Sequence, residues 1–304
     1  MLNDSLRAAR EDANTVGRSF FMCRKRALLA TVLGPVLASG VWMAASAHAA
    51  DKSAPAAAPA AAAPAAAAPS APAAPRKATP AERAEMRRAD PLTRMAFWST
   101  EAERDGRDVE AGVGLSQALR ALGRYDEAAD AAATVLIVAP DNYEALMESA
   151  RANVARGQGF YAIEPGRKAA ALQPRDWRPL SLLGVAYEQA KRDDEALAAH
   201  RQAVALAPAE AVPLTNLAMH LASTGDLPGA EKLLRQAAAL PTATIQVRQN
   251  LALVVGLQGR LDEAERLARQ DLPPESVDNN LAWLRAAVGQ ASASRSYDAV
   301  KAGG

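Results

Sequence analysis

LSQALRALGRYDEAADAAATVLIVAP, residues 115–140, consists of two apolar-rich halves separated by a glycine, and it ends in a proline. The same residue types return every 34 positions along the chain. Three columns follow this period: Gly123, Gly157, Gly225 and Gly259, with Lys191 in the missing place; Ala128, Ala162, Ala196, Ala230 and Ala264; and Pro140, Pro174 and Pro208. A fixed period of this length is the signature of a repeat protein.

Each unit has the pattern of two antiparallel helices. Small residues at positions 8 and 20 let the helices approach closely, and the glycine at position 15 permits a tight turn between them. Aromatic residues make up 4% of the chain and hydrophobic residues 50%, which favours alanine-rich helix packing over an all-β fold. We therefore predict an all-α solenoid of about five helical hairpins, over 109–142, 143–176, 177–210, 211–244 and 245–273.

This pattern resembles that of the tetratricopeptide repeat (TPR) family. The units begin at Val109, Tyr143, Trp177, Ala211 and Ile245, and they carry the family's Gly, Ala and Pro at positions 15, 20 and 32. The resemblance implies that the first helices of the units line a concave, peptide-binding face. Three residues depart from the pattern: Pro165 is expected to start or kink the second helix of unit 2, Pro241 comes one residue early, and Asp271 replaces a small residue in unit 5.

Both ends of a solenoid need a cover, because a terminal repeat otherwise exposes its apolar face. Before the first repeat, Asp90 and Pro91 have the form of a cap and a helix-opening proline, within an N-terminal capping helix predicted over 79–108. We also predict a C-terminal capping helix over 274–290 and a frayed tail over 291–304. Its apolar stripe consists of Val277, Leu281, Leu284 and Val288, with Trp283 beside it.

Residues 1–49 have the form of an N-terminal extension followed by a secretory signal peptide, with Met22 as an alternative start. Basic residues precede an uncharged apolar run that ends in Ala47-His48-Ala49, so we expect cleavage before Ala50 and a periplasmic location. An uncleaved anchor stays open, because about 20 apolar residues can span a bilayer. Residues 50–78 form a predicted disordered Ala/Pro-rich linker, which is either a tether across the periplasm or an inert tail.

The composition argues against several classes of function. The 35 Lys and Arg residues nearly balance the 34 Asp and Glu residues, so nothing suggests nucleic-acid binding. The single cysteine excludes a disulfide framework and a Cys-based zinc site. Gly157 and Gly159 are spaced as in a dinucleotide loop, but no strand precedes them. His200 and His220 are interpreted as packed or solvated histidines, so we predict no enzyme, no cofactor and no metal.

The family's concave-face positions 2, 5, 6, 9 and 12 predict a peptide-binding surface in the C-terminal half. Asn216 and Asn250 take position 6 of neighbouring units, so their carboxamides would stack and could bind a ligand backbone. The other predicted members are Arg178, Thr215, Met219, Gln246, Gln249 and Leu253. In the alternative interpretation, asparagine at this position serves packing or a hydrogen bond between helices of the stack.

A narrower likeness rests on VRQNLALVVGLQGRLDEAERLARQDLPPE, residues 247–275, and ADPLTRMAFWSTEAERDG, residues 89–106. These stretches resemble the TadD family of Flp pilus assembly proteins, the TPR components of the tight-adherence system. The resemblance implies a non-enzymatic periplasmic or outer-membrane-associated adaptor, with the pilus secretin or its accessory components as partners. Members of that family are often lipoproteins, whereas this chain has no cysteine at the end of its apolar run. Membrane association would then come through a partner or an uncleaved N-terminal segment.

Two other functions remain as hypotheses. The chain could be a passive oligomeric scaffold or spacer of the cell envelope, whose outer helices self-associate. An envelope hydrolase or glycosyltransferase that carries TPRs is the third hypothesis. It lacks support, because only short caps remain once the signal peptide, the linker and the repeats are subtracted.

Overall fold

The structure, a computed structural model, describes residues 76–302, with side chains for residues 76–289. The predicted signal peptide and all but the last residues of the predicted linker lie outside this range. Every regular element in the described part is an α-helix: α2 (Pro80–Met86), α3 (Pro91–Arg104), α4 (Val109–Ala121), α5 (Tyr125–Val138), α6 (Tyr143–Ala155), α7 (Gly159–Leu172), α8 (Trp177–Gln189), α9 (Asp193–Leu206), α10 (Ala211–Ser223), α11 (Leu227–Ala238), α12 (Ile245–Leu257), α13 (Leu261–Ala268) and α14 (Pro274–Ala302). None of these helices combines the length and the apolar character that a membrane span requires.

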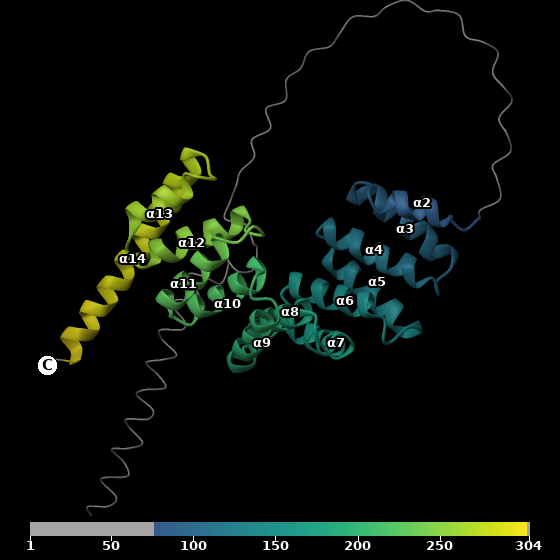
Figure 1. Ribbon diagram of the computed structural model, residues 1–304, viewed down its shortest axis with the longest axis horizontal. Helices are drawn as coiled ribbons and strands as arrows, with labels where there is room; N and C mark the ends of the chain where they lie inside the picture. Colours follow the sequence, from purple (N-terminus) through teal and green to yellow (C-terminus); the bar gives the residue numbers. More distant parts are fainter. Residues whose placement is uncertain (1–75, 303–304) are drawn as a thin grey trace, which may run out of the picture.

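Helices α4 to α13 form five consecutive hairpins that stack into an arc (Figure 1), which confirms the predicted all-α repeat fold. The turn inside a hairpin depends on backbone of the left-handed region. Gly123, Gly157, Gly225 and Gly259 have φ angles of 76°, 77°, 97° and 86°. Lys191 takes the same place in the third hairpin with φ 60°, so a residue with a side chain adopts the glycine conformation there.

In three of the five hairpins, the residue before the first helix caps that helix with its side chain. The side chains of Asp108, Asn142 and Asp176 accept hydrogen bonds from the first backbone N–H groups of α4, α6 and α8. Such caps satisfy donors that have no partner inside the helix. They explain why these three helices start at the first residue of each 34-residue unit.

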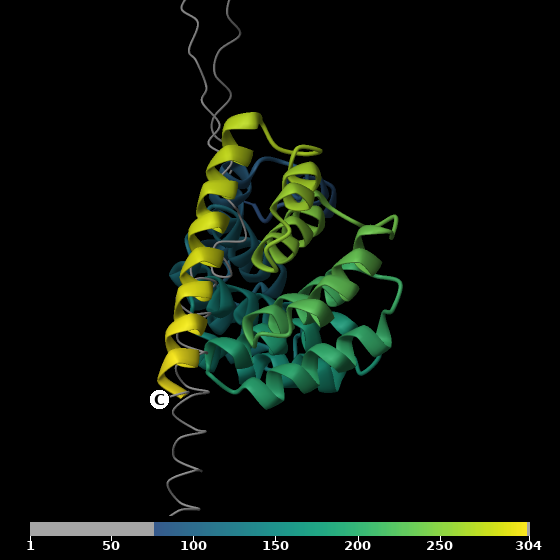
Figure 2. The same ribbon diagram turned by 90° about the vertical axis from the view of Figure 1, so that its left-hand side faces the viewer.

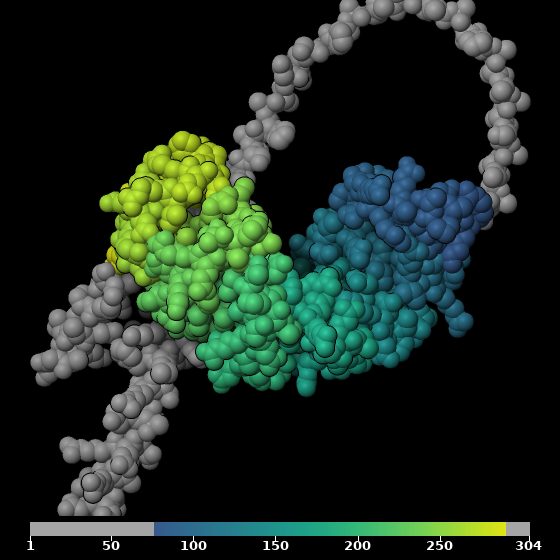
Figure 3. Space-filling model, in the orientation of Figure 1, coloured from purple at the N-terminus to yellow at the C-terminus, as the bar shows by residue number. Residues whose placement is uncertain are grey.

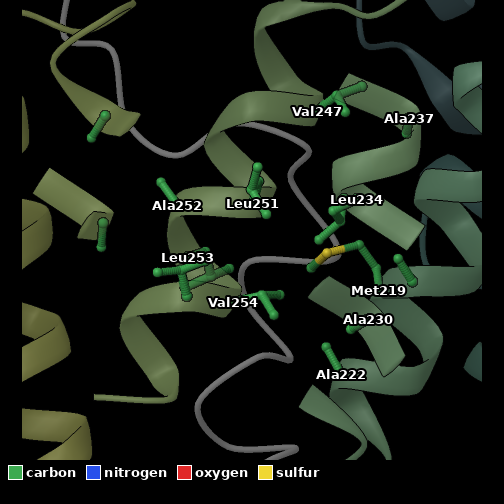
Figure 4. Packing of buried hydrophobic residues seen from close by; sticks show 14 of the residues in the cluster. Met219, Ala222, Ala230, Leu234, Ala237, Val247, Leu251, Ala252, Leu253 and Val254 are labelled. Atoms are coloured by element: carbon green, nitrogen blue, oxygen red, sulfur yellow. The ribbon is translucent and has the colours of Figure 1, made fainter. Parts of the chain in front are cut away.

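The core consists of a series of hydrophobic clusters along the stack and is built largely on alanine. The five alanines of the position-20 column are all buried: Ala128, Ala162, Ala196, Ala230 and Ala264. Larger side chains fill the C-terminal part, where Met219, Leu234, Leu251 and Leu253 pack between α10, α11 and α12 (Figure 4). Small residues let the helices of a hairpin approach, and leucines fill the space between hairpins.

The N-terminal cap consists of two helices, so the prediction of one helix over 79–108 is wrong in this respect. α2 ends at Met86 and α3 starts at Pro91. Asp90 caps α3 by accepting hydrogen bonds from the backbone N–H groups of Leu92 and Thr93. Proline disfavours helical backbone at the residue before it, so the helix of residues 80–86 cannot continue through Asp90.

α14 is longer than the predicted C-terminal cap. It covers the last repeat with Val277, Leu281 and Leu284, which are all buried. The helix then continues to Ala302 without a break (Figure 2), so neither its predicted end at 290 nor the predicted frayed tail is found. Apart from Gly289, the segment up to Ala302 contains no glycine or proline that would end a helix.

The three departures from the repeat pattern have different outcomes. α7 runs through Pro165 and does not start there. Proline removes the hydrogen bond to the carbonyl of Tyr161, and this residue is exposed, so water can satisfy that carbonyl. α11 ends at Ala238, two residues earlier in its unit than α5, α7 and α9, in agreement with the early Pro241. α13 ends at Ala268, before Asp271, whose carboxylate pairs with Arg248 at 2.6 Å.

Candidate binding surface on the first helices

The first helices of the hairpins line the inner side of the arc. Each of α4, α6, α8 and α10 contacts the next first helix as well as its own hairpin partner. Within the described residues, successive second helices make no contacts of similar extent with each other. Because the inner helices lie closer together than the outer ones, the stack curves, and Figure 3 shows the hollow between its two ends.

In the first two units the inner face carries a cluster of charge. Glu148 of α6 is only 1% exposed and accepts hydrogen bonds from two arginines. Its carboxylate oxygens lie 2.7 Å from Nε of Arg120 and 2.6 Å from Nη1 of Arg151. Both arginines are partly exposed, so this part of the surface presents positive charge above a buried carboxylate.

The predicted stack of two asparagines does not act as one unit. The amide nitrogen of Asn216 donates to the hydroxyl oxygen of Ser181 on the preceding first helix at 2.8 Å. This contact is the hydrogen bond between helices that the alternative interpretation of the sequence describes. The side chain of Asn250 has no hydrogen-bond partner among the described residues, so only this member of the pair offers a free carboxamide.

Three other predicted members of the site belong to the interior. Met219 and Leu253 lie in the hydrophobic core, and Leu253 is only 1% exposed. Thr215 is also buried, and its hydroxyl donates to the backbone oxygen of Ala211 at 2.8 Å. Their burial leaves little surface for a ligand on the concave face, so the structure does not favour them as contact residues, and that role stays a prediction. The concave-face positions of the family identify a helix face, and part of that face is covered by the neighbouring helix.

Arg178 is exposed but is already paired. Its guanidinium lies 2.6 Å from a carboxylate oxygen of Asp176, which also accepts the hydroxyl of Tyr143 at 2.5 Å. Burial acts to raise the pKa of Asp176, and the hydrogen bonds from Arg178 and Tyr143 outweigh it, so the pKa falls to about 2. Burial and the bond to this carboxylate raise the pKa of Tyr143 to about 12. These three residues join the second unit to the third.

The free polar groups of the surface gather at the start of α12. Gln246 is exposed, and Gln249 and Asn250 are half-buried. None of the three has a hydrogen-bond partner among the residues that the structure describes. Each carboxamide can donate two hydrogen bonds and accept two, which suits the alternating donors and acceptors of a peptide backbone. Of the eight predicted site residues, these three are the accessible ones whose side chains have no partner within the described part of the chain.

The structure also brings together three residues that the sequence analysis did not connect. Oε1 of Glu188, on α8, lies 3.2 Å from Nε2 of His200 on α9 and 2.8 Å from Nδ1 of His220 on α10. The two histidines are buried, at 1% and 3% exposure. Burial acts to raise the pKa of Glu188, but the hydrogen bonds from the histidines outweigh it and hold the pKa below its usual range.

A sequence signal for this cluster exists. His200 is at position 24 of its unit, where the other units have Ala132, Gly166, Leu234 and Ala268. His220 is at position 10, where the other units have Ala118, Ala152, Ala186 and Val254. A polar ring in two columns that are otherwise small or apolar indicates that the two rings meet at one helix junction.

Comparisons with known proteins agree with this geometry. The family model "Tetratricopeptide repeat" matches residues 180–212. A thermophilic TPR protein of Thermus thermophilus is 27% identical, with a TM-score of 0.51, and the alignment covers 58% of this chain and 98% of that chain. A TPR protein of Parabacteroides merdae is 13% identical, with a TM-score of 0.57, and the alignment covers 68% of this chain and 86% of that chain. No curated protein matches the sequence significantly.

The fold therefore defines the chain as a helical-hairpin solenoid, a class of protein that presents one long curved face to its partners. More particularly, residues 180–212, in the third hairpin and the turn after it, match the tetratricopeptide repeat model, and the stack of hairpins is similar in fold to a solved TPR protein. Proteins with this repeat typically act as scaffolds for interactions between proteins.

Proposed function

We propose that this protein is a non-enzymatic adaptor that binds an extended segment of another protein on the inner face of its last repeats. The carrying observation is the set of free carboxamides on α12, Gln246, Gln249 and Asn250, beside a rigid hydrophobic core. Binding to groups on a rigid scaffold costs less conformational entropy than binding to groups that must first become ordered. Contacts of α12 with α10, α11 and α13 fix the backbone from which these amides project.

The setting that we propose is the assembly of a tight-adherence (Flp) pilus or secretion machine. The support is the resemblance of residues 89–106 and 247–275 to the TadD family, together with the form of residues 1–49 as an export signal. The proposed partner is the pilus secretin or one of its accessory components. The proposed location is the periplasm, in association with the outer membrane through that partner.

Substitution of the three amides tests the binding surface. The triple variant Gln246→Ala, Gln249→Ala, Asn250→Ala is expected to bind the partner at least about tenfold more weakly, since each lost hydrogen bond costs about 0.5–1.5 kcal/mol. The partner would be captured from solubilised cell envelope with the full chain as bait, identified by mass spectrometry and titrated against both baits.

The matched control is Gln202→Ala, Gln236→Ala, Gln270→Ala, which removes three exposed amides outside the first helices. It should retain the affinity of the unaltered chain. Equal affinity of both triple variants would refute the proposed surface. Capture of proteins unrelated to a pilus or secretion machine, lost in the first variant alone, would keep the surface and refute the setting.

A passive scaffold is a second candidate, favoured by apolar side chains on the second helices. Ile137 on α5 is 82% exposed, and Phe160 and Tyr161 on α7 form an exposed edge-to-face ring pair. Such residues on neighbouring outer helices can serve self-association. Light scattering separates the two candidates, because a monomer at all concentrations contradicts the scaffold.

A further inference from the structure

We propose that Glu188, His200 and His220 form a binding site for a divalent transition metal ion, zinc in the first place, at the junction of the third and fourth repeats. The site is independent of the proposed binding surface on α12. It combines ligands from three consecutive helices, α8, α9 and α10, so an ion would tie two repeats together. One ligand atom from each residue lies within 4.8 Å of the other two.

The donor set suits zinc. Two imidazole nitrogens and one carboxylate oxygen form a set of three protein ligands that is found where zinc keeps its fourth position for water or another ligand. Bonds of about 2.0–2.1 Å in a tetrahedron place two ligand atoms about 3.3 Å apart. The separations from Glu188 Oε1, 3.2 Å to His200 and 2.8 Å to His220, are close to this value. The three ligand atoms all lie within 4.8 Å of one another, so an ion would move the carboxylate and draw the two rings closer together.

The shape of the surroundings indicates that the cluster is a built site. Position 8 of the third unit is Gly184, where the other units have alanine or serine. A Cβ atom on Gly184 would lie 2.2 Å from Cε1 of His200, so the ring occupies space that this glycine leaves free. The histidine thus fits against the first helix of its own hairpin, with Nε2 directed at Glu188.

Hydrogen bonds within the cluster do not provide a partner for every ring nitrogen of the two histidines. Both histidines share the single oxygen Oε1 of Glu188. Nδ1 of His200 is buried without a hydrogen-bond partner. Burial of a polar ring under these conditions is costly, and apolar residues fill the same positions in the other units. A metal ion would replace two hydrogen bonds to one carboxylate oxygen with two coordinate bonds, which gives a reason for polar rings at this junction.

Exposure indicates where a fourth ligand would enter. The Glu188 side chain is 23% exposed, whereas both histidines are buried. Water or a partner's side chain can therefore approach from the side of the carboxylate, on the inner layer of helices. Nε2 of His200 and Nδ1 of His220 would bind the ion without a proton. The proton of each neutral ring would then lie on the other ring nitrogen. No net proton release is needed from a neutral ring.

Zinc titration of the full chain, without a polyhistidine tag, tests the site. Isothermal calorimetry should give one Zn²⁺ per chain with a Kd of about 10 µM or tighter. Glu188→Gln keeps the shape and removes the charged ligand, so it should weaken binding at least tenfold. His220→Asn should do the same, since it keeps a polar atom near Nδ1. Co²⁺ should give visible absorption typical of tetrahedral nitrogen and oxygen ligands in the unaltered chain only.

The matched control is Glu144→Gln, which removes an exposed carboxylate from α6 and should leave Zn²⁺ binding unchanged. Circular dichroism checks that every variant is folded. Absence of saturable Zn²⁺ binding by the unaltered chain would overturn the proposal. Binding of equal strength in Glu188→Gln and Glu144→Gln would overturn it as well, because the ion would then be held elsewhere, for example near His48.

Discussion

Lys191 carries a backbone cost that glycine avoids at the same turn of the other repeats. Its φ of 60° lies in the left-handed region, which costs a residue with a Cβ atom about 1–2 kcal/mol. Glycine loses about 0.5–1 kcal/mol more in backbone entropy on folding, which offsets part of the stability gained by relieving the left-handed backbone. Lys191→Gly is therefore expected to raise the free energy of unfolding by about 0.5–1 kcal/mol, as measured by urea denaturation.

A neighbouring turn provides the control. Gln158 follows Gly157 in the second hairpin and has φ −104°, which any residue can adopt. Gln158→Gly should leave stability unchanged or lower it slightly, since it only adds freedom to the unfolded chain. If Lys191→Gly destabilises the protein as Gln158→Gly does, the left-handed backbone at Lys191 carries no cost.

Individual residues of the candidate site show what a periodic sequence pattern can and cannot predict. Periodicity placed Asn250 and Gln246 on the first helix of the last repeat, where the structure has them. It left open whether Asn216 binds a ligand or a neighbouring helix, because the hydrogen bond to Ser181 depends on the distance between two helices. The same limit applies to Leu253, which a neighbouring helix covers, and to His200, whose partners lie on two other helices.

At the scale of a helix, the buried Arg83 makes most of the ion pairs that link α2 to the solenoid, and the exposed Arg87 adds one to Glu110. Arg83 lies 2.8 Å from Glu101, 2.6 Å from Asp108 and 2.9 Å from Glu110. The Arg83 guanidinium holds the pKa of Asp108 well below its usual range. Arg83→Met would leave the carboxylate of Glu101 with Arg104 alone, and that of Asp108 with Lys77 alone, as ion-pair partners within the described residues, at a cost of about 1–3 kcal/mol.

That loss should be local, because repeats contact only their neighbours. Hydrogen exchange should show lost protection in α2 and α3, with α8 and α9 little changed. Arg88→Met, which alters an exposed arginine just after the same helix, is the control and should retain protection throughout. Unchanged exchange of α3 in Arg83→Met would mean that the ion cluster does not hold the cap.

The sequence predicts the ends of a helix where a capping or helix-breaking residue is present. The first helices start at the predicted positions because capping residues or turns precede them, as at Asp108 and Asn142. The end of α14 was not predictable in this way. No strong breaker lies between Gly289 and Ala302, so the polar composition that suggested a tail is compatible with a helix. A polar composition therefore predicts that a segment is exposed to solvent, whereas helix-breaking and capping residues predict where a helix ends.

At the scale of the whole molecule, stability should decline towards any end that loses its cover. α14 buries Leu284 against Gly256 of α12, where an added Cβ atom would lie only 2.4 Å from the leucine side chain. Val277 and Leu281 extend this contact along the same helix. Removal of residues 274–304 would therefore expose the apolar face of the fifth repeat.

In a linear stack, an exposed face destabilises the repeat that carries it first, and the effect weakens with each unit along the chain. The truncated chain is expected to lose hydrogen-exchange protection in α12 and α13, to lose less in α10 and α11, and to keep it in α6 and α7. Removal of residues 291–304 alone is the matched control, because it leaves the three buried side chains in place. A uniform loss along all five repeats would show instead that the solenoid unfolds as one cooperative unit, and α14 would then stabilise the inner face as far away as Glu148.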